Sequence, residues 1–175
     1  MSSIRLYNVF FICILLSILA MTGCGSESII LPSEGGSIEP GFYTGTIINT
    51  ITSTTSTGVK NTTQETVPIN IQINEDGSIY SGGEQVYVGM SDTINLGSDP
   101  MTATVTGISG DTDTLVINFT ISGKYETATI SGYMTETFQS NTQGGLNLKQ
   151  YTQMLWSGNG FSIYQTSSGT AELTK

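Results

Sequence analysis

The chain has no histidine, and only two of its 175 residues are cysteines. Without histidine, catalytic triads of the Ser-His-Asp and Cys-His types are excluded, together with the commonest general base near neutral pH. The usual zinc sites also lose their most frequent ligands. These absences predict a protein that is not an enzyme and has no cofactor. We therefore predict no catalytic residue and no metal ligand; a carboxylate pair of the glycosidase kind is the catalytic alternative that stays open.

Basic residues are scarce as well. Five Lys and Arg residues face fourteen Asp and Glu residues, which gives a formal net charge of −9 at pH 7. Nucleic-acid binding needs a basic surface, so a nucleic-acid partner is excluded. Anionic lipid headgroups would repel the protein surface, whereas a cationic partner would be attracted to it.

One apolar run lies near the start of the chain, from Val9 to Met21. It is too short to cross a membrane as a helix, which needs about 20 apolar residues. Its length suits the apolar core of a secretory signal peptide, which is followed by small residues at the cleavage site. The run therefore predicts export from the cytoplasm.

The residues that close this run, Met21-Thr22-Gly23-Cys24, resemble the lipobox of bacterial lipoproteins, with Met21 where leucine is usual. The resemblance implies cleavage between Gly23 and Cys24 and attachment of a diacylglyceryl group to the Cys24 thiol. A third acyl chain, such as palmitate, is often added to the new amino terminus. Two or more acyl chains anchor a protein stably, so we expect a lipid-anchored protein.

The remaining cysteine and the residue after Cys24 fit this expectation. Cys13 lies inside the apolar run and would leave with it, so Cys24 has no partner for an internal disulfide. Gly25 follows Cys24, where an aspartate tends to retain lipoproteins at the inner membrane of enteric-type bacteria. By analogy, we expect anchoring at the outer membrane, or at the cell surface in an organism with one membrane.

The chain divides into three segments. Residues 1–23 form the signal peptide, and residues 24–40 hold the lipidated cysteine and a tether rich in Gly, Ser and Pro. A flexible tether of about 16 residues spans roughly 20–24 Å on average. Residues 41–175 have the length of one domain.

Alternation of apolar and polar residues predicts β-strands throughout this domain. In the clearest strand, four apolar residues from Val67 to Ile73 alternate with polar ones and with Pro68, which suits an edge or outward-facing position. The segment Asn74–Gly77 predicts a tight hairpin loop after it.

Three later segments lead to further expectations. Gln85–Met90 is expected to be a strand, with Asp92–Leu96 as its partner. Ser122–Lys124 is expected to turn the chain toward Ala128, and Thr170–Lys175 to form a short closing strand.

In all, eight to ten short strands joined by hairpin-length turns predict an all-β antiparallel meander. We favour a small up-and-down barrel, with a β-sandwich as the alternative. The opening Gly41-Phe42-Tyr43, followed by a long connection, has a faint resemblance to lipocalin-type barrels, which carry tryptophan where Tyr43 stands.

Two groups of residues invite a functional interpretation. Asp111 and Asp113 suggest calcium, but they lack the further oxygen ligands of a calcium loop, and turn formation is the better interpretation. Large apolar residues could line a pocket, although core packing is their more frequent use; they are Tyr43, Met101, Phe119, Met134, Met154, Trp156 and Phe161.

The sequence therefore predicts a lipid-anchored, extracytoplasmic binding module without catalytic activity, whose ligand-binding residues it does not identify. The expected partner is a small apolar ligand in the barrel or another protein. The alternative is a structural or protein-interaction lipoprotein of the envelope, including an inhibitor of a cationic hydrolase. For that alternative, Ser157-Gly-Asn-Gly-Phe161 resembles the Ser-Gly-x-x-Tyr loop of barrel-type lysozyme inhibitors, with Phe161 in place of tyrosine.

Overall fold

A computed structural model describes residues 38–96 and 99–175, which form ten β-strands and no helix. Their order along the chain is β1 (Gly41–Thr55), β2 (Lys60–Ile73), β3 (Ile79–Ser81), β4 (Glu84–Val86), β5 (Ser91–Leu96), β6 (Asp99–Gly110), β7 (Thr114–Tyr125), β8 (Ala128–Ser140), β9 (Leu146–Gly158) and β10 (Phe161–Thr174).

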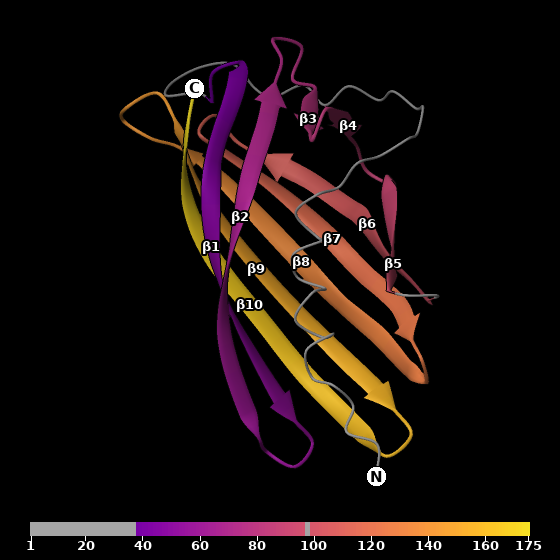
Figure 1. Ribbon diagram of the computed structural model, residues 1–175. Helices are drawn as coiled ribbons and strands as arrows, with labels where there is room; N and C mark the ends of the chain where they lie inside the picture. Colours follow the sequence, from indigo (N-terminus) through magenta and orange to yellow (C-terminus); the bar gives the residue numbers. More distant parts are fainter. Residues whose placement is uncertain (1–37, 97–98) are drawn as a thin grey trace.

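All ten strands belong to one antiparallel sheet with the order β4-β3-β2-β1-β10-β9-β8-β7-β6-β5. The sheet curls into a half-barrel, with β1 and β2 on one side and β5 and β6 on the other (Figure 1). β4 and β5 follow each other in the chain but lie at opposite ends of the sheet. The segment between them contacts β6, where Gly89 N donates to Val105 O and Val105 N to Met90 O, both at 2.8 Å. This short connection brings the two ends of the curled sheet toward each other.

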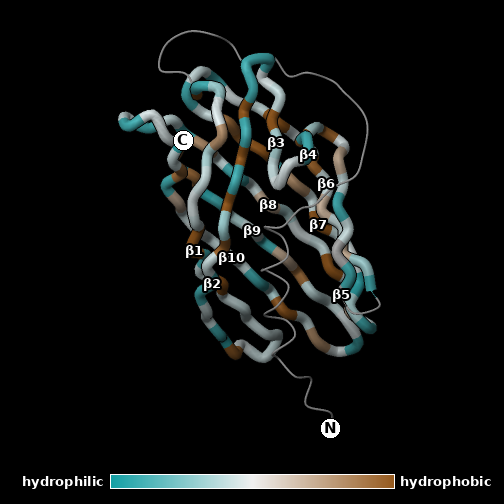
Figure 2. The backbone as a smooth tube through the Cα atoms, turned by 45° about the horizontal axis from the view of Figure 1, so that its top comes forward, coloured by the Kyte–Doolittle hydropathy of each residue, from teal (hydrophilic) through white to brown (hydrophobic). Residues whose placement is uncertain are grey.

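Each long strand buries every second side chain, because successive residues of a strand point to opposite faces of the sheet. The pattern is clear in β7, where Leu115, Ile117, Phe119 and Ile121 are at most 6% exposed and the residues between them are more exposed. Figure 2 shows the resulting mixture of hydrophobic and hydrophilic residues along the strands. The inner face of the half-barrel is thus the buried face.

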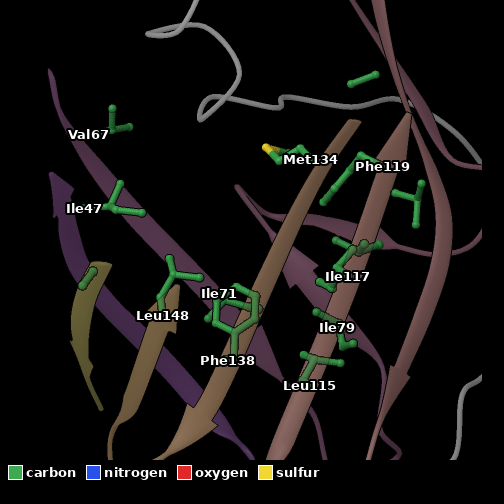
Figure 3. Close-up of a cluster of buried hydrophobic side chains, with 14 of the residues drawn as sticks. Ile47, Val67, Ile71, Ile79, Leu115, Ile117, Phe119, Met134, Phe138 and Leu148 are labelled. Carbon is green, nitrogen blue, oxygen red and sulfur yellow. The ribbon is translucent and has the colours of Figure 1, made fainter. Parts of the chain in front are cut away.

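The inner face is filled by one apolar core. Ile47, Val67 and Ile71 of β1 and β2 face Leu115, Ile117, Phe119, Met134, Phe138 and Leu148 of β7, β8 and β9 (Figure 3). Burying one such aliphatic side chain contributes roughly 1.5–3 kcal/mol to stability. Packing between the two sides of the curled sheet therefore holds the half-barrel in shape.

The predicted fold class is confirmed: the domain is an all-β antiparallel meander in a single curled sheet, and it is not a sandwich of two sheets. The predicted loop at Asn74–Gly77 joins β2 to β3, with Gly77 at φ +80°. Pro68 is exposed in a part of β2 that pairs with β1 only, since β3 pairs with Ile71–Ile73. An edge or outward-facing position was expected for this proline, which cannot donate a ladder hydrogen bond, and the exposed position matches the second of these.

One predicted strand pair is wrong. The segment Gln85–Met90 does not form one strand, because β4 ends at Val86 and the chain turns at Tyr87–Met90. Met90 N donates to Tyr87 O at 3.1 Å, and Gly89 has a φ of +93°. β4 pairs with β3, and β5 pairs with β6, so Asp92–Leu96 is not the partner of the preceding strand.

Two further boundaries also differ from the expectation. Ser122–Lys124 lies within β7, and the turn to β8 falls at Glu126 and Thr127. Thr170–Lys175 is not a separate short strand, because β10 runs without interruption from Phe161 to Thr174. In both cases a glycine (Gly123 or Gly169) lies inside a strand and does not end it.

Candidate functional site

The outer face of β8, β9 and β10 carries three exposed tyrosine side chains and one exposed leucine. Tyr133, Tyr151, Leu155 and Tyr164 are 40–43% exposed, and they surround Gln153. Strand alternation explains this placement, since Tyr151, Gln153 and Leu155 alternate with buried residues of β9. We call these five residues the tyrosine cluster.

Specific contacts order the tyrosine cluster. The Tyr133 hydroxyl donates to Gln153 Oε1 at 2.9 Å, and the Tyr151 hydroxyl donates to the same oxygen at 3.4 Å. The Tyr133 and Tyr151 rings lie 6.1 Å apart between centroids. Leu155 is the register partner of Tyr164 on β10. The Tyr133 and Tyr151 rings are therefore held in place before any partner binds.

The tyrosine cluster itself contains no charged side chain, although the chain is strongly acidic; the charged neighbour on β9 is exposed Lys149, two residues before Tyr151 on the same face. Its register partners on the same face are Ser131, Thr135, Thr166 and Ser168. Desolvation, followed by the nearby Tyr151, raises the pKa of both Tyr133 and Tyr164 above 10.0. The cluster is thus a neutral surface that combines apolar rings with hydroxyl and amide groups.

The inner face holds a second unusual feature, a row of four polar residues and one glycine across five neighbouring strands. In register order the row runs Glu65 on β2, Asn49 on β1, Gly169 on β10, Gln150 on β9 and Glu136 on β8. We call it the inner polar row. Asn49 is 3% exposed and Gln150 is 6% exposed, whereas Glu65, Gly169 and Glu136 are half-buried, so the row is partly enclosed.

The two ends of the inner polar row differ in their hydrogen bonding. Gln150 Nε2 donates to Glu136 Oε1 at 2.8 Å. Among the residues that the structure describes, Asn49 Oδ1 and both carboxylate oxygens of Glu65 are inaccessible and have no hydrogen-bond partner. Burial raises the pKa of Glu65, and it also raises the pKa of Glu136 against the opposing effect of the Gln150 hydrogen bond.

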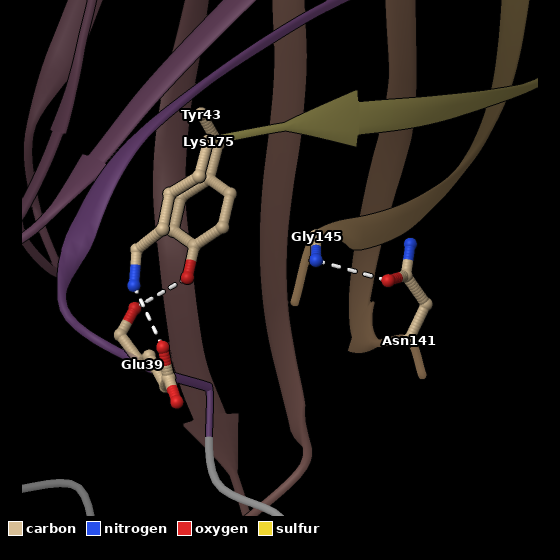
Figure 4. A network of polar contacts seen from close by, with 5 residues as sticks. All are labelled: Glu39, Tyr43, Asn141, Gly145 and Lys175. Carbon is tan, nitrogen blue, oxygen red and sulfur yellow. Dashed lines mark hydrogen bonds and ion pairs between the residues drawn. The ribbon is translucent and has the colours of Figure 1, made fainter. Parts of the chain in front are cut away.

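A cavity of about 540 Å³ opens at one end of the half-barrel, between the start of β1 and the loop from β8 to β9. It is lined by Glu39, Tyr43, Asp113, Ser140, Asn141, Thr142, Gly144, Gly145 and Leu146. Beside it, Lys175 Nζ lies 2.8 Å from Glu39 Oε2 and 5.8 Å from the centroid of the Tyr43 ring (Figure 4). The Lys175 hydrogen bond lowers the pKa of Glu39.

Hydrogen bonds fix the walls of this cavity. The Tyr43 hydroxyl donates to the backbone oxygen of Glu39, and Asn141 Oδ1 accepts from the backbone N–H of Gly145 at 2.9 Å (Figure 4). The volume suits a small molecule. Its wall mixes acidic, hydroxyl and amide groups, so it differs from an apolar barrel interior.

The residues that the sequence singled out have mixed outcomes. Cys24 and Gly23 lie outside the described residues. The large apolar residues pack in the core, as predicted: Tyr43, Met101, Phe119, Met134, Met154 and Trp156 are at most 6% exposed, and only Phe161 is half-buried. Asp111 Oδ1 accepts from the backbone N–H of Asp113 at 3.3 Å and of Thr114 at 3.0 Å, which is the predicted turn chemistry.

Sequence reasoning missed both the tyrosine cluster and the inner polar row. Strand alternation places Tyr151 and Leu155 on the face opposite Trp156, so part of the cluster could have been found. The row could not, because it depends on the register of five strands, which a single sequence does not fix.

In the described part of the chain, no three or more acidic, histidine or cysteine side chains come together in a way that could hold a metal ion. Residues 38–96 and 99–175 also include no helix that could span a membrane. Comparison of the chain with known protein families, with curated proteins and with solved structures found no match.

Proposed function

We propose that this protein is a lipid-anchored, extracytoplasmic binding module without catalytic activity, and that it binds a protein partner through the tyrosine cluster. The lipobox-like residues that end in Cys24 support the anchor. The absence of histidine from the sequence supports a role in binding. The observation that carries the proposal is the grouping of Tyr133, Tyr151, Leu155 and Tyr164 on one outer face.

The tyrosine cluster has the composition of an interface core. Aromatic residues are enriched and charged residues depleted at the centres of protein–protein interfaces. Tyrosine also contributes a large contact area at a low cost in side-chain entropy, and it is common among the residues that dominate binding energy. Exposed apolar groups gathered in one patch mark such surfaces more often than scattered ones do.

The core favours an outer binding surface over an apolar ligand inside the barrel. Ile47, Leu115, Leu146 and Leu173 have no measurable exposure, and the side chains around them pack together. A small apolar ligand would have to displace these contacts. The tyrosine cluster needs no such rearrangement.

Photo-crosslinking in cells of the native host tests the proposal. A photoreactive phenylalanine at position 155 should give one adduct of defined mass, and the triple variant Tyr133→Ala, Tyr151→Ala, Tyr164→Ala should lose it. Position 62 is the control, because Thr62 is exposed on β2 and bonds only to Thr52 in the described structure. Equal crosslinking at both positions, or an adduct that survives the triple variant, would count against the cluster.

The lipid anchor has its own test. The variant Cys24→Ala should move the protein from the membrane fraction to the soluble fraction and abolish labelling by radioactive palmitate. Wild-type protein that stays in the membrane fraction without incorporating label would contradict the anchor.

Inhibition of a cationic hydrolase is a second candidate function, supported by the position of one loop. The segment Ser157–Phe161 spans the turn between β9 and β10 and begins two residues after Leu155 of the tyrosine cluster. Loop and cluster together would give a continuous surface for an enzyme of opposite net charge. A lysozyme activity assay with the purified protein tests this candidate, and full lysozyme activity at a large molar excess of the protein would exclude that enzyme as the target.

A further inference from the structure

The cavity at the end of the half-barrel is shaped by hydrogen bonds within the protein. Its walls come from three separate segments, which are the start of the domain up to β1, the β6–β7 turn and the β8–β9 loop. Ile38 N donates to Thr112 O and Ser140 N donates to Asp113 O, both at 2.8 Å, so hydrogen bonds join all three segments. The volume of about 540 Å³ is that of a small-molecule site. Because the cavity is already formed, binding a ligand there costs little ordering of the protein.

The lining of this cavity is polar, with Leu146 as the one aliphatic side chain among the described residues that form it. Thr142 brings a hydroxyl, which both donates and accepts, and the Asn141 amide brings a donating nitrogen. Glu39 and Asp113 bring carboxylates, each of which offers about four acceptor positions. The wall can thus bind a molecule that carries donors and acceptors side by side.

The charges at the cavity select against ions. The Lys175 ammonium lies 2.8 Å from Glu39 Oε2 and 5.8 Å from the centroid of the Tyr43 ring (Figure 4). A Cβ at Gly41 would overlap Lys175 Cε, so this glycine makes room for the lysine side chain. A cationic ligand would compete with the Lys175 ammonium for both of its contacts, whereas an anionic ligand would face the carboxylates of Glu39 and Asp113. A neutral ligand meets neither obstacle.

Sugars combine these properties. Each sugar hydroxyl donates one hydrogen bond and also accepts, and two neighbouring hydroxyls can bind the two oxygens of one carboxylate. A closed sugar ring is stiff, so it loses little conformational entropy on binding. We propose that the cavity binds a neutral saccharide, with its hydroxyls on Asp113, Asn141 and Thr142.

Saturation-transfer difference NMR with three neutral disaccharides, maltose, lactose and N,N′-diacetylchitobiose, tests the proposal. The full-length chain is kept in a non-ionic detergent without a sugar headgroup, and each disaccharide is added alone at millimolar concentration. We expect saturation transfer to at least one of them. Thr142→Trp, at an exposed position of the cavity wall, should block the cavity and abolish the signal. The matched control Thr127→Trp should retain it, because Thr127 is exposed in the turn at the opposite end of β8.

Removal of one carboxylate gives a second, quantitative test. Asp113→Ala should weaken binding of the responding disaccharide by about tenfold or more, because hydrogen bonds to a charged group are lost. The control Glu75→Ala removes the same charge from the exposed β2–β3 loop, and its affinity should stay within about twofold of the wild type. Circular dichroism reports whether the variants fold. Should Asp113→Ala not fold, Asp113→Asn keeps the shape of the side chain and still has to weaken binding by about threefold or more.

Four results would overturn the proposal. They are the absence of saturation transfer to all three disaccharides, a signal that survives in Thr142→Trp, an equal loss of affinity in Glu75→Ala, and displacement of the disaccharide by an equal concentration of spermidine. The last result would assign the cavity to cations. The cavity lies at one end of the half-barrel and the tyrosine cluster on the outer face of β8, β9 and β10, so either proposal can fail without the other.

Discussion

Replacing Gly169 by alanine should destabilise the domain by about 1–2 kcal/mol. An added Cβ would overlap Asn49 Oδ1 and would lie 2.9 Å from both Ile47 Cγ1 and the backbone oxygen of Ile48. The Asn49 side chain can rotate, but the Ile48 oxygen belongs to the β1–β10 ladder and cannot move independently. Overpacking of this kind costs about 1–3 kcal/mol, and the smaller entropy of the unfolded alanine chain offsets about 0.4–1 kcal/mol.

Urea unfolding followed by tryptophan fluorescence measures this loss. Trp156 is the single tryptophan of the sequence and is 2% exposed, so its emission reports on the core. The matched control is Gly107→Ala on β6, where the nearest atom to an added Cβ is Asn118 Nδ2 at 3.8 Å. That variant should be as stable as the wild type or slightly more stable. If Gly169→Ala is no less stable than Gly107→Ala, the claim that Asn49, Ile47 and Ile48 pack closely against Gly169 is refuted.

Three further predictions concern the core, one turn and the buried carboxylates. Ile47→Ala should lower the free energy of unfolding by about 2–5 kcal/mol, because Ile47 is fully buried. Ile48→Ala should change it by less than about 0.5 kcal/mol, because Ile48 is 54% exposed. Similar losses in the two variants would contradict the assignment of Ile47 to the core and Ile48 to the surface. Glu126 has a φ of +51°, in the left-handed region that costs a non-glycine residue about 1 kcal/mol or more. Glu126→Gly should therefore stabilise the domain by up to about 1 kcal/mol. A lower free energy of unfolding for this variant in urea would refute the prediction. Burial raises the pKa of Glu65 and of Glu136 above the ordinary value of 4.5, so the folded state holds their protons more tightly than the unfolded state does. The free energy of unfolding should therefore fall as the pH rises through the raised pKa values. The variant Glu65→Gln, Glu136→Gln should flatten this dependence above pH 4.5, and an unchanged slope would show that other groups cause it.

The fold class could be predicted because strand alternation and turn residues are local properties. The run from Val67 to Ile73 and the loop at Asn74–Gly77 show this, since each depends on residues close in sequence. The predicted turn at Ser122–Lys124 failed because Gly123 serves a contact between strands. A Cβ there would lie 2.6 Å from Pro100 O and 2.7 Å from Met101 Cα, on the neighbouring strand β6.

The candidate sites depended on information that the sequence does not carry. A tyrosine at position 133 and one at position 151 become neighbours only when β8 and β9 pair in the observed register. Likewise, Glu65 and Glu136 are 71 positions apart in the chain and share a row only because β1, β10 and β9 lie between their strands. Alternation predicts which face a side chain takes, but register decides its partners.

Hydroxyl-radical footprinting tests the proposed binding surface most directly. The protein would be oxidised once in native cell envelopes and once after purification, and the oxidation of individual side chains compared by mass spectrometry. Phe42 is the internal reference, because it is 55% exposed and lies on β1, away from the tyrosine cluster. The proposal predicts that Tyr133, Tyr151 and Tyr164 are oxidised several-fold less in the envelope while Phe42 is unchanged. Equal oxidation of these tyrosines in both samples would contradict a binding role for this face.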